Sequence, residues 1–151
     1  VKIAFYASDI FYSNNQVQFK RYDKSKIKLI QTGARQCTTA ESVLKSQAYF
    51  KNNPSTLAAF SAVTNRIDRA LSAEPDQLAS NIYYNQLLLN KIGVTPKKIM
   101  QFIAAAHKLG IAIKVSGAGA VAGDNAGILV AVAHSELDKI CHEYGYSQIE
   151  L

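Results

Sequence analysis

The chain has 151 residues, of which 48% are hydrophobic and 19% charged, a balance typical of one folded domain with a sizeable core. Seventeen Lys and Arg against eleven Asp and Glu give a formal net charge of +6, which favours phosphates or other acidic partners without fixing the fold. The hydrophobic content excludes a disordered tail, and no apolar run reaches the roughly 18 residues of a membrane span. Because Cys37 and Cys141 lie far apart with no C-x-x-C pair, we expect reduced thiols in a cytoplasmic protein, without a disulfide scaffold or a zinc site.

Three short stretches rich in β-branched and aromatic residues open the chain. Residues 1–6, 16–21 and 27–31 are separated by polar turn residues at 8–9, 13–15 and 23–26. We expect strands in all three, the first two in an N-terminal β-hairpin and the third as the first strand of a larger sheet.

Four helices are predicted between residues 38 and 110. Thr38 and Glu41 have the spacing of a capping box, so a helix should begin there and continue towards Phe50. Apolar residues then recur every three or four positions in segments 55–71, 75–92 and 95–109. Prolines near the starts of the last two segments, and Gly93 and Gly110 after their ends, are typical helix boundaries.

The C-terminal third alternates strands and a helix. Compact apolar runs at 111–116 and 127–133 predict strands, a helix is expected from a cap at Ser135 to Gly145, and residues 146–150 predict a last strand. From residue 27 onward this order predicts an α+β fold with a ferredoxin-like split βαββαβ core, an extra helical insertion, and helices on one face of an antiparallel sheet. Lys114, on the first of these strands, is expected to be a solvated edge residue.

The segment between the predicted strands at 111–116 and 127–133 is the most informative part of the sequence. Residues 116–127 begin with a serine and are mostly small residues, so several backbone N–H groups can point into one concavity and hold a phosphate or carboxylate. No G-K-[ST] follows, as in a P-loop, and a strand rather than a helix comes next, unlike the dinucleotide fingerprint. A purely structural hairpin loop is the alternative.

Three segments together resemble the GHMP small-molecule kinases, in particular the mevalonate and phosphomevalonate kinase branch. The sequence K-V-S-G-A-G at 114–119, followed by G-D-N-A-G-I at 123–128, resembles the third conserved motif of that family. Residues 85–99 are similar to the helix–turn–helix before that motif, and residues 32–43 are similar to the family's strand-to-helix segment. The three matches occur in family order and cover residues 32–133.

The resemblance implies the carboxyl-terminal domain of a kinase that transfers a phosphoryl group from MgATP to mevalonate, in isoprenoid precursor synthesis. Phosphomevalonate kinase or another GHMP kinase is the alternative. Residues 1–31 would lead into a core at 32–151, within one domain. The family's ATP loop is absent from the sequence, so ATP and Mg²⁺ would bind only in the full-length enzyme, and this fragment alone would be inactive.

The implied partners follow from the same resemblance. They are an N-terminal domain that carries the ATP loop, and a small-molecule substrate. A face left exposed without that domain would favour self-association. Neither membrane nor nucleic-acid binding is expected.

The resemblance also implies site residues. Ser116, Gly117, Ala118 and Gly119 would face the transferred phosphate or the substrate oxygens, and Gly123 and Asp124 would shape the far side of the loop. Arg35 and Thr39 would lie near a substrate phosphate or carboxylate. Asp9 faintly echoes the family's catalytic base, and no metal-ligating residues are expected.

Each assignment outside the loop's first half has a structural alternative. Asp124 could form an Asx turn, Thr39 could belong to the helix cap, and Asp9 could be a turn residue. A function of a different class also stays open, because a ferredoxin-like sheet with a basic surface could bind a metabolite or RNA without catalysis, although no RNP-like strand motif is present.

Overall fold

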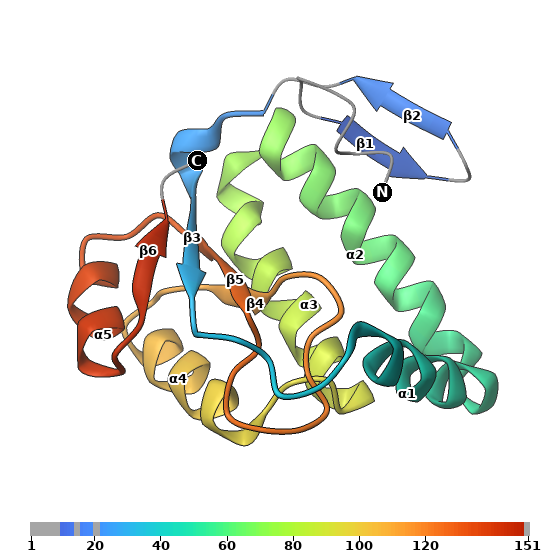
Figure 1. The fold of residues 1–151 in the computed structure, drawn as a ribbon. Coiled ribbons are helices and arrows are strands. Elements are labelled where there is room, and N and C mark those ends of the chain that lie inside the picture. Colours follow the sequence, from blue (N-terminus) through green and yellow to red (C-terminus); the bar gives the residue numbers. More distant parts are fainter. Residues whose placement is uncertain (1–9, 14–15, 20–21, 150–151) are drawn as a thin grey trace.

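The computed structural model describes residues 10–13, 16–19 and 22–149, and its centre is a four-stranded antiparallel sheet (Figure 1). The strand order is β4-β5-β3-β6. The bounds are Ile27–Gln31 for β3, Ile113–Val115 for β4, Ile128–Val132 for β5 and Ser147–Ile149 for β6. Because β5 lies between β3 and β4, the strands interleave as in a split βαββαβ unit, and the predicted α+β ferredoxin-like core is confirmed.

Five α-helices in the described residues surround this sheet. They are α1 (Thr39–Asn52), α2 (Pro54–Ser72), α3 (Leu78–Ile92), α4 (Lys97–Lys108) and α5 (Leu137–Glu143). Helices α1 to α3 form the predicted insertion between β3 and α4. None of the helices in the described part of the chain is long and apolar enough to cross a membrane.

The helices cover both faces of the sheet rather than one. On one face, Ile30 and Leu129 belong to the main core together with Phe102 of α4 and Ile140 of α5. On the other face, a smaller core joins Ala70 of α2 with Leu78 and Ile82 of α3, packed against strand residues. The expectation of helices on a single face is therefore wrong, because alternate residues of β3 and β5, such as Ile27 and Val132, are apolar on the second face too.

The N-terminal hairpin is present, but its first strand differs from the prediction. Strand β1 (Ile10–Ser13) pairs antiparallel with β2 (Gln16–Phe19), apart from the main sheet (Figure 1). Only two residues separate these strands in the sequence, and so short a connection favours pairing of immediate neighbours. The predicted strand at residues 1–6 lies outside the described residues.

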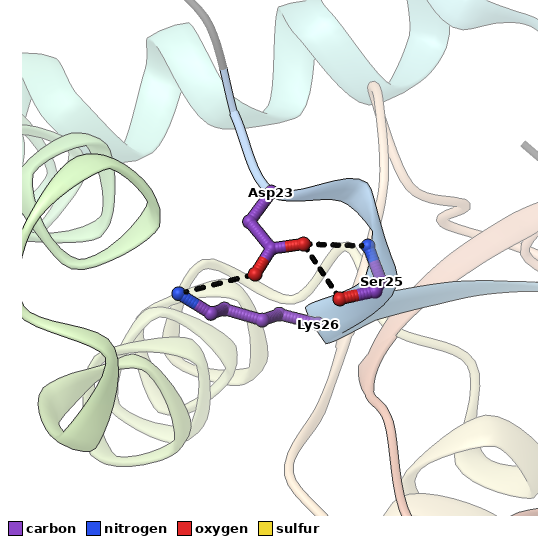
Figure 2. Close-up of polar contacts among 3 residues, drawn as sticks. All are labelled: Asp23, Ser25 and Lys26. Carbon is purple, nitrogen blue, oxygen red and sulfur yellow. Dashed lines mark hydrogen bonds and ion pairs between the residues drawn. The ribbon is translucent and has the colours of Figure 1, made fainter.

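A short turn leads into β3. The Asp23 carboxylate accepts hydrogen bonds from the Ser25 N–H at 3.1 Å and the Ser25 hydroxyl at 2.6 Å, and lies 3.4 Å from the Lys26 ammonium (Figure 2). These contacts cap the 3₁₀ turn Lys24–Lys26. The Ser25 hydroxyl, more than any other contact, lowers the pKa of the Asp23 carboxyl. The polar segment predicted as a turn thus fixes where β3 begins.

Helix α1 begins with the predicted capping box. The Thr38 hydroxyl accepts a hydrogen bond from the Glu41 N–H at 3.2 Å, and the Thr38 N–H donates to the Glu41 carboxylate at 2.7 Å. Helix α5, by contrast, does not begin at the predicted cap Ser135. Its preceding residue is Glu136, whose N–H donates to Nδ1 of His134.

Removal of the α1 cap gives a test of this local structure. We expect Thr38→Ala to lower the free energy of unfolding by about 1 kcal/mol, because the N-terminal amides of α1 lose their acceptor. Thr39→Ala is the matched control, since that exposed hydroxyl caps nothing, and it should change stability by less than about 0.5 kcal/mol. Urea unfolding followed by circular dichroism measures both. Equal losses would contradict the cap assignment.

Candidate functional site

A cavity of about 670 Å³ lies where β3 and β4 end and β5 begins. Three segments line it: residues 31 and 33–35 at and after the end of β3, residues 116–118 after β4, and residues 126–128 at the start of β5, together with Thr39 of α1. Because neighbouring strands are antiparallel, the end of β3 and the end of β4 both meet the start of β5 at this edge of the sheet. In Figure 1 the connection from β3 to α1 runs beside the loop between β4 and β5.

The cavity brings together five of the residues singled out from the sequence, namely Arg35, Thr39, Ser116, Gly117 and Ala118. They come from segments more than 75 positions apart, so only the sheet pairing places them side by side. Three others, Gly119, Gly123 and Asp124, do not line the cavity. Asp9 lies outside the described residues.

The loop offers a row of free backbone donors. The N–H groups of Gly117, Ala118 and Gly119 form no hydrogen bond within the described residues. Their neighbours are fixed, because the Ser116 N–H donates to the Ile128 carbonyl at 3.0 Å and the Ala120 N–H donates to the Val94 carbonyl at 2.8 Å. Successive unpaired amides in a loop with left-handed glycines form a concavity that accepts anions.

Gly117 needs its conformation but not its small size. Its backbone φ is +70°, a conformation that residues other than glycine seldom adopt. A Cβ added to this residue would nevertheless meet nothing within 4 Å. The space over this residue is therefore open to a ligand.

Arg35 is held beside the loop by two hydrogen bonds. Its Nη1 donates to the Gly119 carbonyl at 3.3 Å, and its Nη2 donates to the Thr39 hydroxyl at 3.1 Å. A guanidinium has five N–H donors, so others are left for an anion in the cavity. Because Thr38 is the cap of α1, the alternative that Thr39 belongs to that cap is wrong.

Gly119 and Gly123 are required by packing within the protein. A Cβ on Gly119 would lie 2.2 Å from the Val94 carbonyl oxygen, and one on Gly123 would lie 1.8 Å from the side-chain oxygen of Gln36. The same Gln36 oxygen accepts a hydrogen bond from the Asp124 N–H at 3.1 Å. The Asp124 carboxylate is exposed and accepts no hydrogen bond within the described residues, so the Asx turn considered for it is not formed.

The two loops are joined by side chains that sequence reasoning did not select. Thr32 donates its hydroxyl hydrogen to the Gly127 carbonyl at 2.9 Å and accepts from the Ala126 N–H at 3.1 Å, and Asn125 donates to the Ala34 carbonyl. The Cys37 sulfur accepts from the Val121 N–H. These partners are 84 to 95 positions apart, and no local pattern in the sequence identifies such pairs.

The Cys37 thiol responds to this environment. Burial acts to raise its pKa, but hydrogen bonds from the Val121 N–H, Ser42 and the Ala122 N–H outweigh burial, so the pKa lies below its ordinary value. Cys37 and Cys141 are both free, as expected. No group of three or more His, Cys, Asp or Glu side chains among the described residues could hold a metal ion.

The prediction that Lys114 is a solvated edge residue is wrong. Strand β4 is at the edge of the sheet, but the Lys114 side chain is half-buried on the face that α2 and α3 cover. Its ammonium donates to the Val115 carbonyl at 2.8 Å. Burial lowers the pKa of Lys114 to about 8.

This pKa predicts a pH-dependent stability. Below pH 8 the lysine is charged in the folded and unfolded states, so the whole cost of the desolvated charge is present. Between pH 8 and the unfolded value of 10.5 the folded protein releases its proton first, and stability rises with pH. We expect Lys114→Met to be more stable than the wild type by roughly 1 to 2 kcal/mol at pH 7, allowing for partial solvation. The difference should close towards pH 10.5. Urea unfolding across this range measures it, and a gap that is constant with pH would contradict the assignment.

Comparisons with known proteins agree with the predicted fold. No family model matches the sequence, and no curated protein matches it significantly. Among solved structures, Methanococcus jannaschii mevalonate kinase matches with a TM-score of 0.70 at 16% identity, over 92% of this chain and 45% of that protein. L. major mevalonate kinase in complex with R-mevalonate matches with a TM-score of 0.64 at 19% identity, over 89% of this chain and 43% of that protein. A Lin0012 protein from Listeria innocua matches with a TM-score of 0.69 at 20% identity, over 89% of this chain and 41% of that protein.

The chain thus shares its fold with part of the solved mevalonate kinases, which agrees with the fold that the sequence motifs predicted. Two of these solved structures are mevalonate kinases. The chain spans less than half of the length of each of the three proteins. At these identities the likeness concerns the fold, and the chemistry has to be argued from the site itself.

Proposed function

We propose that this chain is the carboxyl-terminal part of a GHMP-type kinase that transfers a phosphoryl group from ATP to mevalonate or a close relative. The observation that carries the proposal is the pair of free amides at Gly117 and Ala118, which line the cavity together with Arg35. The fold shared with mevalonate kinases supports the reaction class. Phosphomevalonate is the alternative substrate.

Phosphoryl transfer suits such a site because it asks the protein mainly for positioning and charge stabilisation. Backbone amides held by a fixed loop stabilise developing negative charge without having to reorganise. Arg35 adds a planar donor that can bind two oxygens of one phosphate or carboxylate. The Ser116 hydroxyl lies on the same lining and would contact the substrate or the transferred group.

The residues of this cavity fit the anionic part of the reactants and not the metal. The lining holds a guanidinium, hydroxyls and amides, which donate to oxygens, and it holds no carboxylate. Mg²⁺ bound to ATP neutralises phosphate charge in such reactions. We therefore assign ATP and Mg²⁺ to a cleft completed by a second domain, with this chain binding the acceptor and the transferred phosphate.

A second domain would dock beside α1. Two large apolar side chains on that helix, Val43 and Leu44, are 41% and 64% exposed. Arg35 and Thr39 lie just before and at the start of the same helix, so a domain covering α1 would also close over the cavity. Without that domain these side chains would favour self-association.

Steady-state kinetics on the full-length protein test the proposal. ATP-dependent phosphorylation is measured with mevalonate and with phosphomevalonate as acceptors. We expect Arg35→Ala to lower kcat/KM by roughly 10-fold to 100-fold, since a charged hydrogen bond to an anion contributes about 1.5 to 3 kcal/mol. Ser116→Ala should have a smaller effect in the same direction.

The control is Arg69→Ala, which removes an equal charge from an exposed position on α2. It should leave kcat/KM within about twofold. The proposal fails if the full-length protein phosphorylates neither acceptor. It also fails if both arginine variants lose activity equally.

A further inference from the structure

A second cavity of about 280 Å³ lies on the sheet face covered by α2 and α3. Six apolar side chains form most of its wall: Ile27, Ile67, Leu71, Leu78, Ile82 and Val130. The remaining lining residues are Thr64, Asn85 and Lys114. The wall is thus apolar with a small polar group at β4 and α3, the usual construction of a small-molecule site.

The polar groups of this cavity include hydrogen-bond donors that are free to bind a ligand. The Lys114 ammonium has three N–H donors, and one of them donates to the Val115 carbonyl. The side-chain amide of Asn85 makes no hydrogen bond within the described residues, although Asn85 is 6% exposed. Among the described residues only the Tyr146 hydroxyl is fully buried without a partner, so the Asn85 amide reaches the space of the cavity and is open to a ligand.

The cavity also lacks a counter-charge. No Asp or Glu lines it, so the positive charge of Lys114 faces apolar side chains, which disfavours the charged form. A bound anion would pair the ammonium and accept a hydrogen bond from the Asn85 amide. One negative charge is enough, since a second would in turn be buried without a partner.

We propose that this cavity is a binding site for a small monocarboxylate with an apolar tail, its carboxylate held by Lys114 and Asn85. The tail would lie among the isoleucines and leucines from α2 and α3. A cavity of about 150 Å³ already holds a benzene molecule, so this one has room for a tail of roughly five to seven carbons. The donor set favours a carboxylate over a phosphate monoester, which carries close to two charges at pH 7.

The site adjoins the candidate kinase cavity but is separate from it. Lys114 and Ser116 are two positions apart on and just after β4, as are Val130 and Ile128 on β5, so each pair points to the same face of the sheet. The two cavities share no lining residue. Since Arg35 in the first cavity also attracts carboxylates, a test has to distinguish the two.

Binding of hexanoate to this chain, measured by ligand-observed NMR titration, tests the proposal. We expect saturable binding with a Kd around 1 mM for a ligand of this size. Acetate lacks the tail and hexanol lacks the charge, and each should bind at least about tenfold more weakly than hexanoate. Lys114→Met keeps the apolar stem, removes a desolvated charge and should stay folded. It should weaken hexanoate binding by about tenfold or more and leave hexanol binding unchanged.

Two control variants locate the ligand. Lys28→Met removes an exposed lysine from the same sheet and should leave hexanoate binding unchanged, as should Arg35→Ala in the neighbouring cavity. Asn85→Leu should weaken binding, and a melting temperature measured in parallel shows that it folds. The proposal is overturned if hexanoate does not saturate, if acetate binds equally well, or if Arg35→Ala abolishes binding while Lys114→Met does not.

Discussion

Gly119→Ala is expected to unfold the protein or to lower its free energy of unfolding by roughly 4 kcal/mol or more. The added Cβ would lie 2.2 Å from the Val94 carbonyl oxygen, a distance that real contacts do not show, and the residue has a φ of +68°. That same carbonyl accepts the hydrogen bond from the Ala120 N–H, so moving it away breaks a second interaction. A small local shift would not remove this clash, because the added Cβ would also lie 3.1 Å from the Val94 Cβ.

Gly117→Ala is the matched control for this prediction. Gly117 has nearly the same φ, +70°, but a Cβ there meets nothing within 4 Å. The substitution should therefore cost only the left-handed backbone penalty, roughly 1 to 2 kcal/mol. Urea unfolding of both variants separates conformation from packing. If the two lose equal stability, Gly119 is not packed against Val94 as described.

This pair also changes how the loop should be tested for function. A bulky residue at Gly119 does not distinguish a phosphate site from a structural loop, because it disrupts folding in either case. Gly117→Ala should keep the fold, and it adds a methyl group in open space at the lining of the cavity. It is therefore the informative variant in a kinetic assay of the full-length protein.

Gln86→Met is expected to lower the free energy of unfolding by roughly 2 to 4 kcal/mol. Gln86 is 1% exposed, and its side-chain oxygen accepts a hydrogen bond from the Val115 N–H at 2.7 Å on the edge strand β4. Its amide nitrogen donates to Thr95 and Asn90. Methionine has nearly the same length but no acceptor, so the Val115 N–H would be left buried and unpaired.

Gln36→Met provides the comparison at an exposed position. The Gln36 oxygen likewise accepts a backbone hydrogen bond, from the Asp124 N–H, but water can replace it there. We expect a loss below about 1 kcal/mol. Thermal and urea unfolding should rank the two variants clearly, and similar losses would argue against Gln86 as the residue that satisfies the edge of the sheet.

The role of Gln86 was not foreseen from its sequence context. Residues 85–89 resemble a family segment and belong to the apolar pattern of α3. A glutamine within such a helix is expected on the solvent-exposed polar face. Its partner in β4 is 29 positions away, so the hydrogen bond becomes visible only when α3 lies along the edge of the sheet.

Local signals in the amino-acid sequence predict the order of helices and strands from residue 22 onward. The interval of three or four residues between apolar positions, the Thr38 and Glu41 cap and the glycine after α3 are local signals, because each acts within one helical turn. The three motif segments also identified the fold that solved mevalonate kinases share. The loop is also a candidate site on sequence grounds alone, since runs of small residues are visible without any tertiary information.

The contacts between residues of the two loops depend on the folded sheet and cannot be read from the sequence. Arg35 and Ser116 line one cavity because β5 pairs with both β3 and β4, and sheet pairing over such separations has no local signature. The folded structure also leaves open space beside Gly117 and packs Gly119 against Val94, although the two glycines have nearly the same sequence context and φ. It also placed Lys114 under two helices, because the second face of the sheet is covered, and burial depends on what packs against a strand rather than on the strand's own sequence.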